Sequence, residues 1–290
     1  MSAAAAPRLS RRISEGVFLG FCWAATLVAI VALTAILWSL VSKGVAGFMT
    51  PGGAFDPNVF TKSTPAPGSE GGLLNAILGS LMMCALAMLG AVVIGILAGT
   101  WLSEFARDSR YGKVVRFLND VLLSAPSILV GLFVYEILVA PMKGFSGFAG
   151  AAALGLIAAP VITRATEDIL RLQPVSLREA SVALGAPFWR TILAVIWKSA
   201  RAGMLTGALL AFARISGETA PLLFTAMNNQ FFSVDMTKPT ANLPVVIFNF
   251  ANSAFDDWNR LAWAAALLIA GTVLTVTVIA RILAREPSRS

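Results

Sequence analysis

Six long apolar segments, separated by polar loops, set the pattern of this sequence. They cover residues 17–42, 73–102, 121–142, 144–163, 203–227 and 261–284. A helix needs roughly 20 predominantly apolar residues to cross the hydrocarbon core of a bilayer, and each segment has about that length or more. The pattern predicts an all-α fold, a polytopic transmembrane helical bundle of six spans that occupies residues 1–290 as a single domain.

The composition agrees with a membrane protein. Apolar residues make up 57% of the 290 residues and charged residues only 13%, with a mean hydropathy of +0.79. Soluble globular proteins contain about 45–50% apolar and about 25% charged residues. The formal net charge of +7 is typical of membrane proteins with basic cytoplasmic loops. We therefore expect contact with membrane lipid and none with nucleic acid.

The distribution of basic residues predicts the orientation. Six spans place both termini, together with the loops 104–120 and 164–202, on one side of the membrane. That side holds 16 Lys and Arg residues, whereas the opposite side holds 5. Because basic residues are in excess on the cytoplasmic side, we expect both termini in the cytoplasm. The apolar segment 17–42 is longer than the h-region of a signal peptide, about 7–15 residues, so we expect an uncleaved first span.

Several kinds of reactive chemistry are absent from the sequence. The chain has no histidine, which removes the commonest metal ligand and the usual general base near neutral pH. Its two cysteines, Cys22 and Cys84, lie inside apolar segments and form neither a disulfide framework nor a metal site. No phosphate-binding loop of the G-x-x-x-x-G-K-[ST] type occurs. We expect no catalytic residue, no metal, no cofactor and no ATP binding by this chain.

Two smaller patterns concern helix packing. Gly95 and Gly99, and likewise Gly203 and Gly207, are four residues apart, a spacing that lets transmembrane helices approach closely. The apolar stretch LPVVIFNFA, residues 243–251, is too short to cross a bilayer. We expect this stretch to lie at the membrane interface or over the outer face of the bundle.

The fifth apolar segment contains two charged residues, Arg214 and Glu218. A charge at the bilayer centre costs roughly 2.5–3.5 kcal/mol on insertion scales, but residues four apart lie on one helix face and can pair. Two interpretations stay open. The pair is a structural ion pair, or it lines a translocation path in which the arginine attracts an oxyanion and the glutamate keeps binding weak enough for release. Glu136 is expected to snorkel or to pair between helices.

The loop 164–202 contains signals for two short helices. Ser176 and Glu179 form an S-x-x-E capping box, which starts a helix, and Gly185 is able to end it in the left-handed conformation. Pro187 suits the first turn of a second helix. We expect two helices at an angle, parallel to the membrane, with a bend at Gly185. Such an elbow either binds a cytoplasmic partner or rests on lipid headgroups.

The same loop resembles the EAA motif of ABC-importer permeases, which reads E-A-A, three residues, G, nine residues, I-x-L-P. Glu179, Ala180 and Gly185 match it, and Ser181 takes the place of the second alanine. The L-P pair is replaced by "WK" at residues 197–198. The resemblance implies that the short helix, with these four residues, docks into a cleft on a separate ATPase subunit and transmits the closure of that subunit.

Four further blocks resemble PstA-type permeases of the bacterial phosphate ABC importer. They are GGLLNAILGSL (71–81), APSILVGLF (125–133), ISGETAPLLFTA (215–226) and NLPVVIFNFANSAFDDWNRLAWAAAL (242–267). The resemblance implies a type I ABC importer permease fold in the bacterial inner membrane. It favours the pathway role of Arg214 and Glu218, and it implies that phosphate is the substrate.

The same resemblance implies the partners. They are two copies of an ATPase subunit on the cytoplasmic side, a second homologous permease subunit and a periplasmic phosphate-binding protein. The alternative is a self-sufficient secondary transporter or channel for an anion, which would not need the elbow in the loop 164–202.

Overall fold

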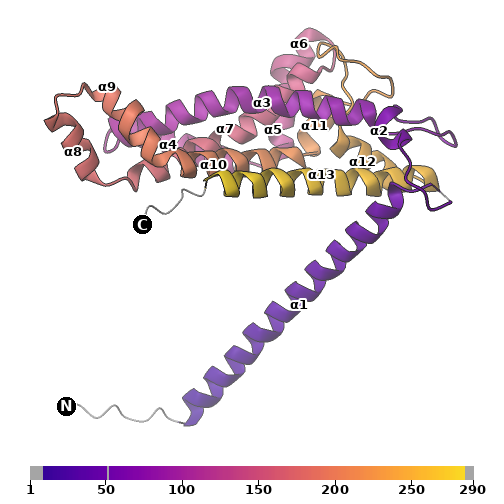
Figure 1. Cartoon of the computed structure of the whole chain (residues 1–290), viewed down its shortest axis with the longest axis horizontal. Helices are drawn as coiled ribbons and strands as arrows, with labels where there is room; N and C mark the ends of the chain where they lie inside the picture. The colour runs from indigo at the N-terminus through magenta and orange to yellow at the C-terminus, as the bar shows by residue number, and fades with distance from the viewer. Residues whose placement is uncertain (1–8, 51, 285–290) are drawn as a thin grey trace.

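The computed structural model describes residues 9–50 and 52–284, and the regular structure in these ranges is almost entirely helical. The α-helices are interrupted by three π-helical turns, named η1 to η3 (Figure 1). The first half contains α1 (Leu9–Gly47), α2 (Asn58–Thr61), α3 (Leu74–Thr100), η1 (Trp101–Phe105), α4 (Arg110–Ser124), α5 (Ser127–Val134), η2 (Tyr135–Val139) and α6 (Ala140–Met142). The second half contains α7 (Gly147–Arg171), α8 (Val175–Ala183), α9 (Phe188–Arg190), η3 (Thr191–Ile196), α10 (Trp197–Ser216), α11 (Ala220–Thr225), α12 (Leu243–Ala251) and α13 (Asp256–Ala284).

Within the described ranges, five helical segments are long and apolar enough to cross a membrane. They are Ser14–Gly47, Leu74–Phe105, Gly147–Arg171, Phe188–Ser216 and Asp256–Ile279. A sixth candidate is the pair Arg110–Ser124 and Ser127–Met142, which is bent by 104° at its break. The expectation of an all-helical, multi-span bundle is confirmed, and the number of spans is six when the bent pair is counted as one.

Helix α7 lies between α3 and α10 and contacts both of them (Figure 1). The glycine pairs make these contacts close. A Cβ atom at Gly99 would lie 2.7 Å from the carbonyl oxygen of Thr163, and one at Gly207 would lie 2.5 Å from the Cβ of Ala165. Because the missing side chains let the backbones approach, the prediction that these glycines serve helix packing is confirmed.

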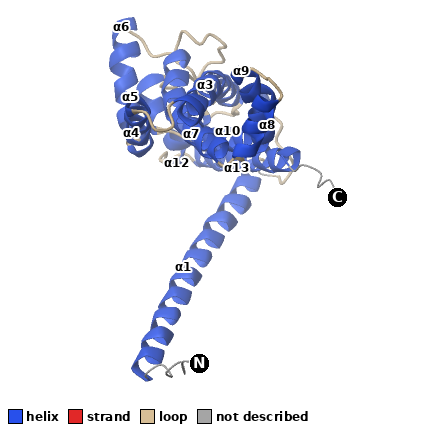
Figure 2. Cartoon of the chain, turned by 90° about the vertical axis from the view of Figure 1, so that its left-hand side faces the viewer, coloured by secondary structure: helices blue, strands red, loops and turns tan. Residues whose placement is uncertain are grey.

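The third apolar segment, 121–142, is not one continuous helix. α4 ends at Ser124, and the chain is extended at Ala125 and Pro126 before α5 begins. A proline disfavours the helical conformation of the residue before it, which places the break at Ala125. α5 packs against α11 and α7, and the chain then leads upward to α6 at the edge of the bundle (Figures 1 and 2). Glu136, in η2, is exposed.

The fourth and fifth segments have different bounds from those expected. α7 continues past residue 163 to Arg171, because Glu167 in its last turns finds ionic partners there. α9, η3 and α10 form one long helical segment that begins at Phe188 and ends at Ser216, so the helix has other bounds than the expected span 203–227. Pro221 has no N–H to donate to the carbonyl four residues earlier, and the chain resumes as the separate helix α11.

The stretch 243–251 forms the nine-residue helix α12, as its length suggested. Its residues Val246 and Phe250 are buried in one apolar cluster with Leu261 of α13, and the Phe250 ring stacks on Trp258 at 4.3 Å between centroids. α12 therefore packs on the bundle rather than crossing the membrane.

Helix α1 stands apart from the other helices. The C-terminal end of α1 contacts α13, and the rest of α1 projects away from the bundle (Figures 1 and 2). None of its most apolar 18-residue window is buried inside the chain. The apolar surface of α1 is thus left for lipid or for another protein.

Candidate functional site

The elbow at the end of the bundle opposite α12 is built from α8 and α9 (Figure 1). α8 begins at Val175 after Pro174, and no side chain caps its N-terminus. The predicted capping box of Ser176 and Glu179 is therefore wrong. Pro174 explains the difference, because its fixed φ and missing N–H start the helix two residues earlier than the box requires.

The bend of the elbow is a Schellman motif. Gly185 adopts φ +77°, its N–H donates to the Val182 carbonyl at 2.9 Å, and the Ala186 N–H donates to the Ser181 carbonyl at 3.2 Å. This pair of hydrogen bonds, with glycine in the left-handed conformation, is a common way to end a helix. Pro187 then caps α9. The predicted bend at Gly185 is confirmed.

The direction of the second elbow helix differs from the prediction. The prediction was a separate helix parallel to the membrane, whereas the chain from Phe188 belongs to the long candidate span that ends at Ser216. The three basic residues in its first half, Arg190, Lys198 and Arg201, are exposed, and they are the reason that the sequence predicted a loop there. A displacement of α8 therefore acts on the start of a candidate membrane span.

The four predicted docking residues do not share one surface. Glu179 and Ala180 are exposed, and Gly185 is exposed at the bend. Ser181 is buried, and its hydroxyl shares a hydrogen bond of 2.8 Å with the Thr191 hydroxyl in η3. Leu184, next to the bend, is 88% exposed. The elbow thus presents a small surface with an apolar tip, while Ser181 holds the elbow together from inside.

A buried ion pair connects the elbow to α3. The Arg178 guanidinium donates to both oxygens of Glu104 in η1, at 3.0 and 2.7 Å, and the Glu104 side chain is only 3% exposed. The hydrogen bonds to Glu104 raise the pKa of Arg178 above its usual range. No pattern in the sequence pairs these two residues, although a glutamate directly after a long apolar segment signals a partner at the membrane boundary.

A second ionic cluster lies where α4 meets α7. Glu167, with a side chain 2% exposed, accepts from Arg116 at 2.6 Å and lies 2.7 Å from Arg171. Arg116 also donates to the carbonyls of Leu102 and Ala106, at 2.8 and 3.2 Å. A π-helical turn leaves backbone groups without their usual helical partners. Arg116 therefore supplies donors to the end of α3.

Two further contacts join the long segment from Phe188 to α3. The Trp197 indole N–H donates to the Thr100 hydroxyl at 3.1 Å. The rings of Phe105 and Phe188 meet edge to face, with centroids 5.3 Å apart. The C-terminal end of α3 and the start of this segment are thus connected by polar and aromatic contacts as well as by the elbow.

Arg214 and Glu218 come together as their spacing predicts. Arg214 Nε lies 3.9 Å from Glu218 Oε1, and the side chains are 41% and 18% exposed. At this distance the two side chains form an ion pair but no hydrogen bond. The pair spans the point where α10 ends and the chain turns at Gly217. A loosely paired arginine retains donors for an anion, whereas Arg178 has already used most of its own.

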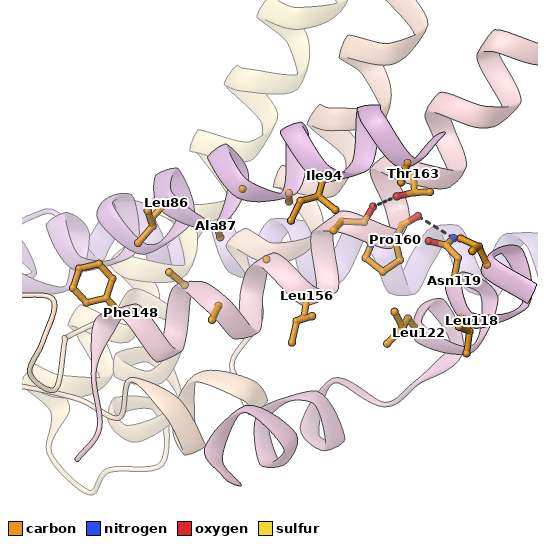
Figure 3. Close-up of a pocket in the computed structure, with 18 residues that line it drawn as sticks. Leu86, Ala87, Ile94, Leu118, Asn119, Leu122, Phe148, Leu156, Pro160 and Thr163 are labelled. Atoms are coloured by element: carbon orange, nitrogen blue, oxygen red, sulfur yellow. Dashed lines mark hydrogen bonds between the residues drawn. The ribbon is translucent and has the colours of Figure 1, made fainter. Parts of the chain in front are cut away.

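An apolar groove of about 560 Å³ runs between α3, α4 and α7 (Figure 3). Its lining contains no charged side chain. Its polar residues include Asn119, whose amide donates to the Pro160 carbonyl at 3.3 Å. An anion has no partner there, so the groove suits lipid chains or a helix. In the described ranges no cluster of three His, Cys, Asp or Glu residues is able to hold a metal ion.

Comparisons with known proteins agree with this geometry. Residues 91–289 match the family model described as binding-protein-dependent transport system inner membrane component. The phosphate transport system permease protein PstA of Pasteurella multocida is 50% identical over 96% of this chain and 97% of the relative. The PstA of Haemophilus influenzae is 48% identical over 94% of each chain.

More distant proteins extend the agreement. A probable phosphate transport system permease protein PstA of Methanocaldococcus jannaschii is 37% identical over 92% of each chain. Among solved structures, a chain of the inward-facing MetNI methionine ABC transporter matches with a TM-score of 0.58 and 17% identity, covering 73% of this chain and 92% of that one. That likeness shows the fold of an importer permease. The chain belongs to the binding-protein-dependent transport system inner membrane components, in the PstA group of permeases.

Proposed function

We propose that this chain is the permease subunit through which an ATP-driven importer moves inorganic phosphate across the bacterial inner membrane. The observation that carries the proposal is the 50% identity to a phosphate transport system permease over 96% of the chain. ATP is hydrolysed on separate subunits. The whole chain acts as one transmembrane domain with both termini in the cytoplasm, as the excess of basic residues on that side supports.

The partners follow from the same assignment. Two copies of an ATPase subunit bind on the cytoplasmic side, a second homologous permease completes the pathway, and a periplasmic phosphate-binding protein delivers the substrate. Support for the first partner comes from the elbow, where Glu179, Ala180 and Gly185 are exposed on the same short segment as Leu184, which is 88% exposed. Exposed apolar side chains rimmed by polar ones are typical of a docking surface. Ser181 supports this surface through its bond to Thr191.

Arg214 and Glu218 line the substrate pathway in this proposal. Intramembrane charges generally mark ion or substrate pathways, and a guanidinium offers phosphate several directed donors. At a separation of 3.9 Å, Arg214 donates no hydrogen bond to Glu218. Phosphate therefore has donors to bind, and Glu218 keeps the attraction weak enough for release.

The test is transport by purified components in lipid vesicles. The chain together with ATPase subunits, a second permease and the binding protein is expected to take up labelled phosphate only when ATP is supplied. The chain alone is expected to take up none. Uptake by the chain alone under an ion gradient would instead support a secondary transporter, and sulfate taken up in preference to phosphate would contradict the proposed substrate.

A further inference from the structure

Arg178 connects three helices through its guanidinium. It belongs to α8, and it forms the two bonds to Glu104 in η1. Its remaining donors reach the end of α7, where they bind the carbonyls of Leu170 and Gln173 at 3.0 Å each. The last carbonyls of a helix lack partners within the helix, and a cation there is favoured by the helix dipole. Arg178 therefore satisfies the end of α7 while holding α3.

Only arginine is able to make this set of contacts. Its planar fork binds both oxygens of a carboxylate and still has donors for neighbouring carbonyls, whereas lysine is a point charge with a different geometry. The site is shielded, since the Arg178 side chain is 20% exposed and Glu104 is 3% exposed. Glu104 is further fixed by the Ser103 hydroxyl at 3.0 Å. Shielded, charge-assisted bonds of this kind are among the stronger ones in proteins.

Two other contacts attach α8 to its surroundings. Ser181 bonds to Thr191 in η3, and Leu177 packs on an apolar cluster that includes Leu170 and Ile196. Ser181 holds α8 to the long segment Phe188–Ser216, whereas Leu177 holds it to an apolar layer to which α3, α7 and that segment all contribute. Arg178 provides the ionic contact from α8 to α3. Arg178 is adjacent in the sequence to Glu179, and Glu179 is exposed on the proposed docking surface.

We infer that Arg178, through Glu104, is the positioning residue that transmits movement of the docked elbow to α3 and α7. The inference rests on the proposed function, because it assumes that an ATPase subunit displaces α8. When α8 moves, the bidentate pair moves the π-helical end of α3 with it, and the bonds to Leu170 and Gln173 carry the end of α7 along. α3 and α7 are packed at Gly99 without space for a Cβ atom, so the two helices move together.

The experiment measures phosphate taken up per ATP hydrolysed in vesicles that hold the complete importer. Arg178→Lys keeps the charge and loses the fork, and Glu104→Gln keeps the shape and loses the charge. Both variants are expected to retain the ATPase subunit at the normal ratio in purification and to hydrolyse ATP. Their uptake per ATP is expected to fall at least about fivefold, the lower end of ordinary coupling between two sites. In the double variant, uptake per ATP is expected to fall no further than in the more affected single variant, because both substitutions remove the same interaction.

The matched control is Arg164→Lys, on α7. Arg164 also pairs with carboxylates, Asp120 and Asp168, but all three side chains are about half exposed. Uptake per ATP is expected to stay unchanged. The inference is overturned if Arg178→Lys and Glu104→Gln keep the wild-type ratio, or if the complex loses its ATPase subunits while the remaining intact complex keeps that ratio. Failure of the wild-type complex to take up phosphate with ATP would overturn the proposed function itself.

Discussion

Replacing Glu167 by glutamine tests whether the ionic cluster between α4 and α7 holds the bundle together. The carboxylate is 2% exposed, and its partners Arg116 and Arg171 are 16% and 34% exposed. Glu167→Gln leaves both guanidinium groups in place and removes the charge that they share. Loss of one partner from a buried ion pair costs about 3–5 kcal/mol. Since both arginines reach solvent in part, we expect the lower end, about 3 kcal/mol.

The adjacent residue provides the control. Asp168→Asn is the same chemical change on the same helix, but the Asp168 side chain is 54% exposed and its partner Arg164 is 46% exposed. Exposed ion pairs are worth about 0.2–1 kcal/mol. The free energy of unfolding is measured on the purified chain in detergent micelles titrated with SDS. If Glu167→Gln costs no more than Asp168→Asn, the cluster does not stabilise the fold and the reasoning from burial is refuted.

Three further predictions concern the substrate pathway, the helix packing and the bend of the elbow. Arg214→Gln is expected to abolish phosphate uptake by the reconstituted importer while all subunits still co-purify; normal uptake would exclude the pathway role. Gly99→Ala is expected to destabilise the bundle by about 1–3 kcal/mol through overpacking, since backbone atoms of α7 lie within 3.0 Å of the new Cβ. Gly90→Ala, with no atom within 4 Å, is instead expected to stabilise α3 by up to about 1 kcal/mol, so equal effects in SDS unfolding would disprove the packing argument. Gly185→Ala is expected to lower the ATPase subunit's affinity for the elbow and to cost about 1–2 kcal/mol, because φ is +77° there; unchanged affinity in a titration would show that the bend does not need glycine.

The presence of each helix could be predicted from the sequence more accurately than the residues at which it begins and ends. Apolar length identifies a span because the hydrocarbon core has a fixed thickness, and every apolar segment proved to be helical over much of its length. The ends depend on local backbone chemistry. Pro126 breaks the third segment and Pro221 limits the fifth, although apolar residues resume shortly after both positions.

Among the charged contacts, the pair within one helical segment could be predicted and the pair between distant segments could not. Arg214 and Glu218 were paired correctly because a helix brings residues four apart onto one face. Arg178 and Glu104 are 74 residues apart, and their meeting depends on how α7 and α8 return to the end of α3. No periodicity within one segment contains that information. The capping box at Ser176 failed for a local reason, since Pro174 starts α8 before the box is able to form.

Cross-linking from the tip of the elbow tests most directly whether another polypeptide drives this bundle. Leu184 is 88% exposed beside the bend, and the chain has only two native cysteines, Cys22 and Cys84, to remove first. With Leu184→Cys in that background, we expect a cross-link to the ATPase subunit in membranes of cells that make the whole importer. A cysteine that reacts with lipid-dissolved probes and never cross-links to that subunit would contradict the account.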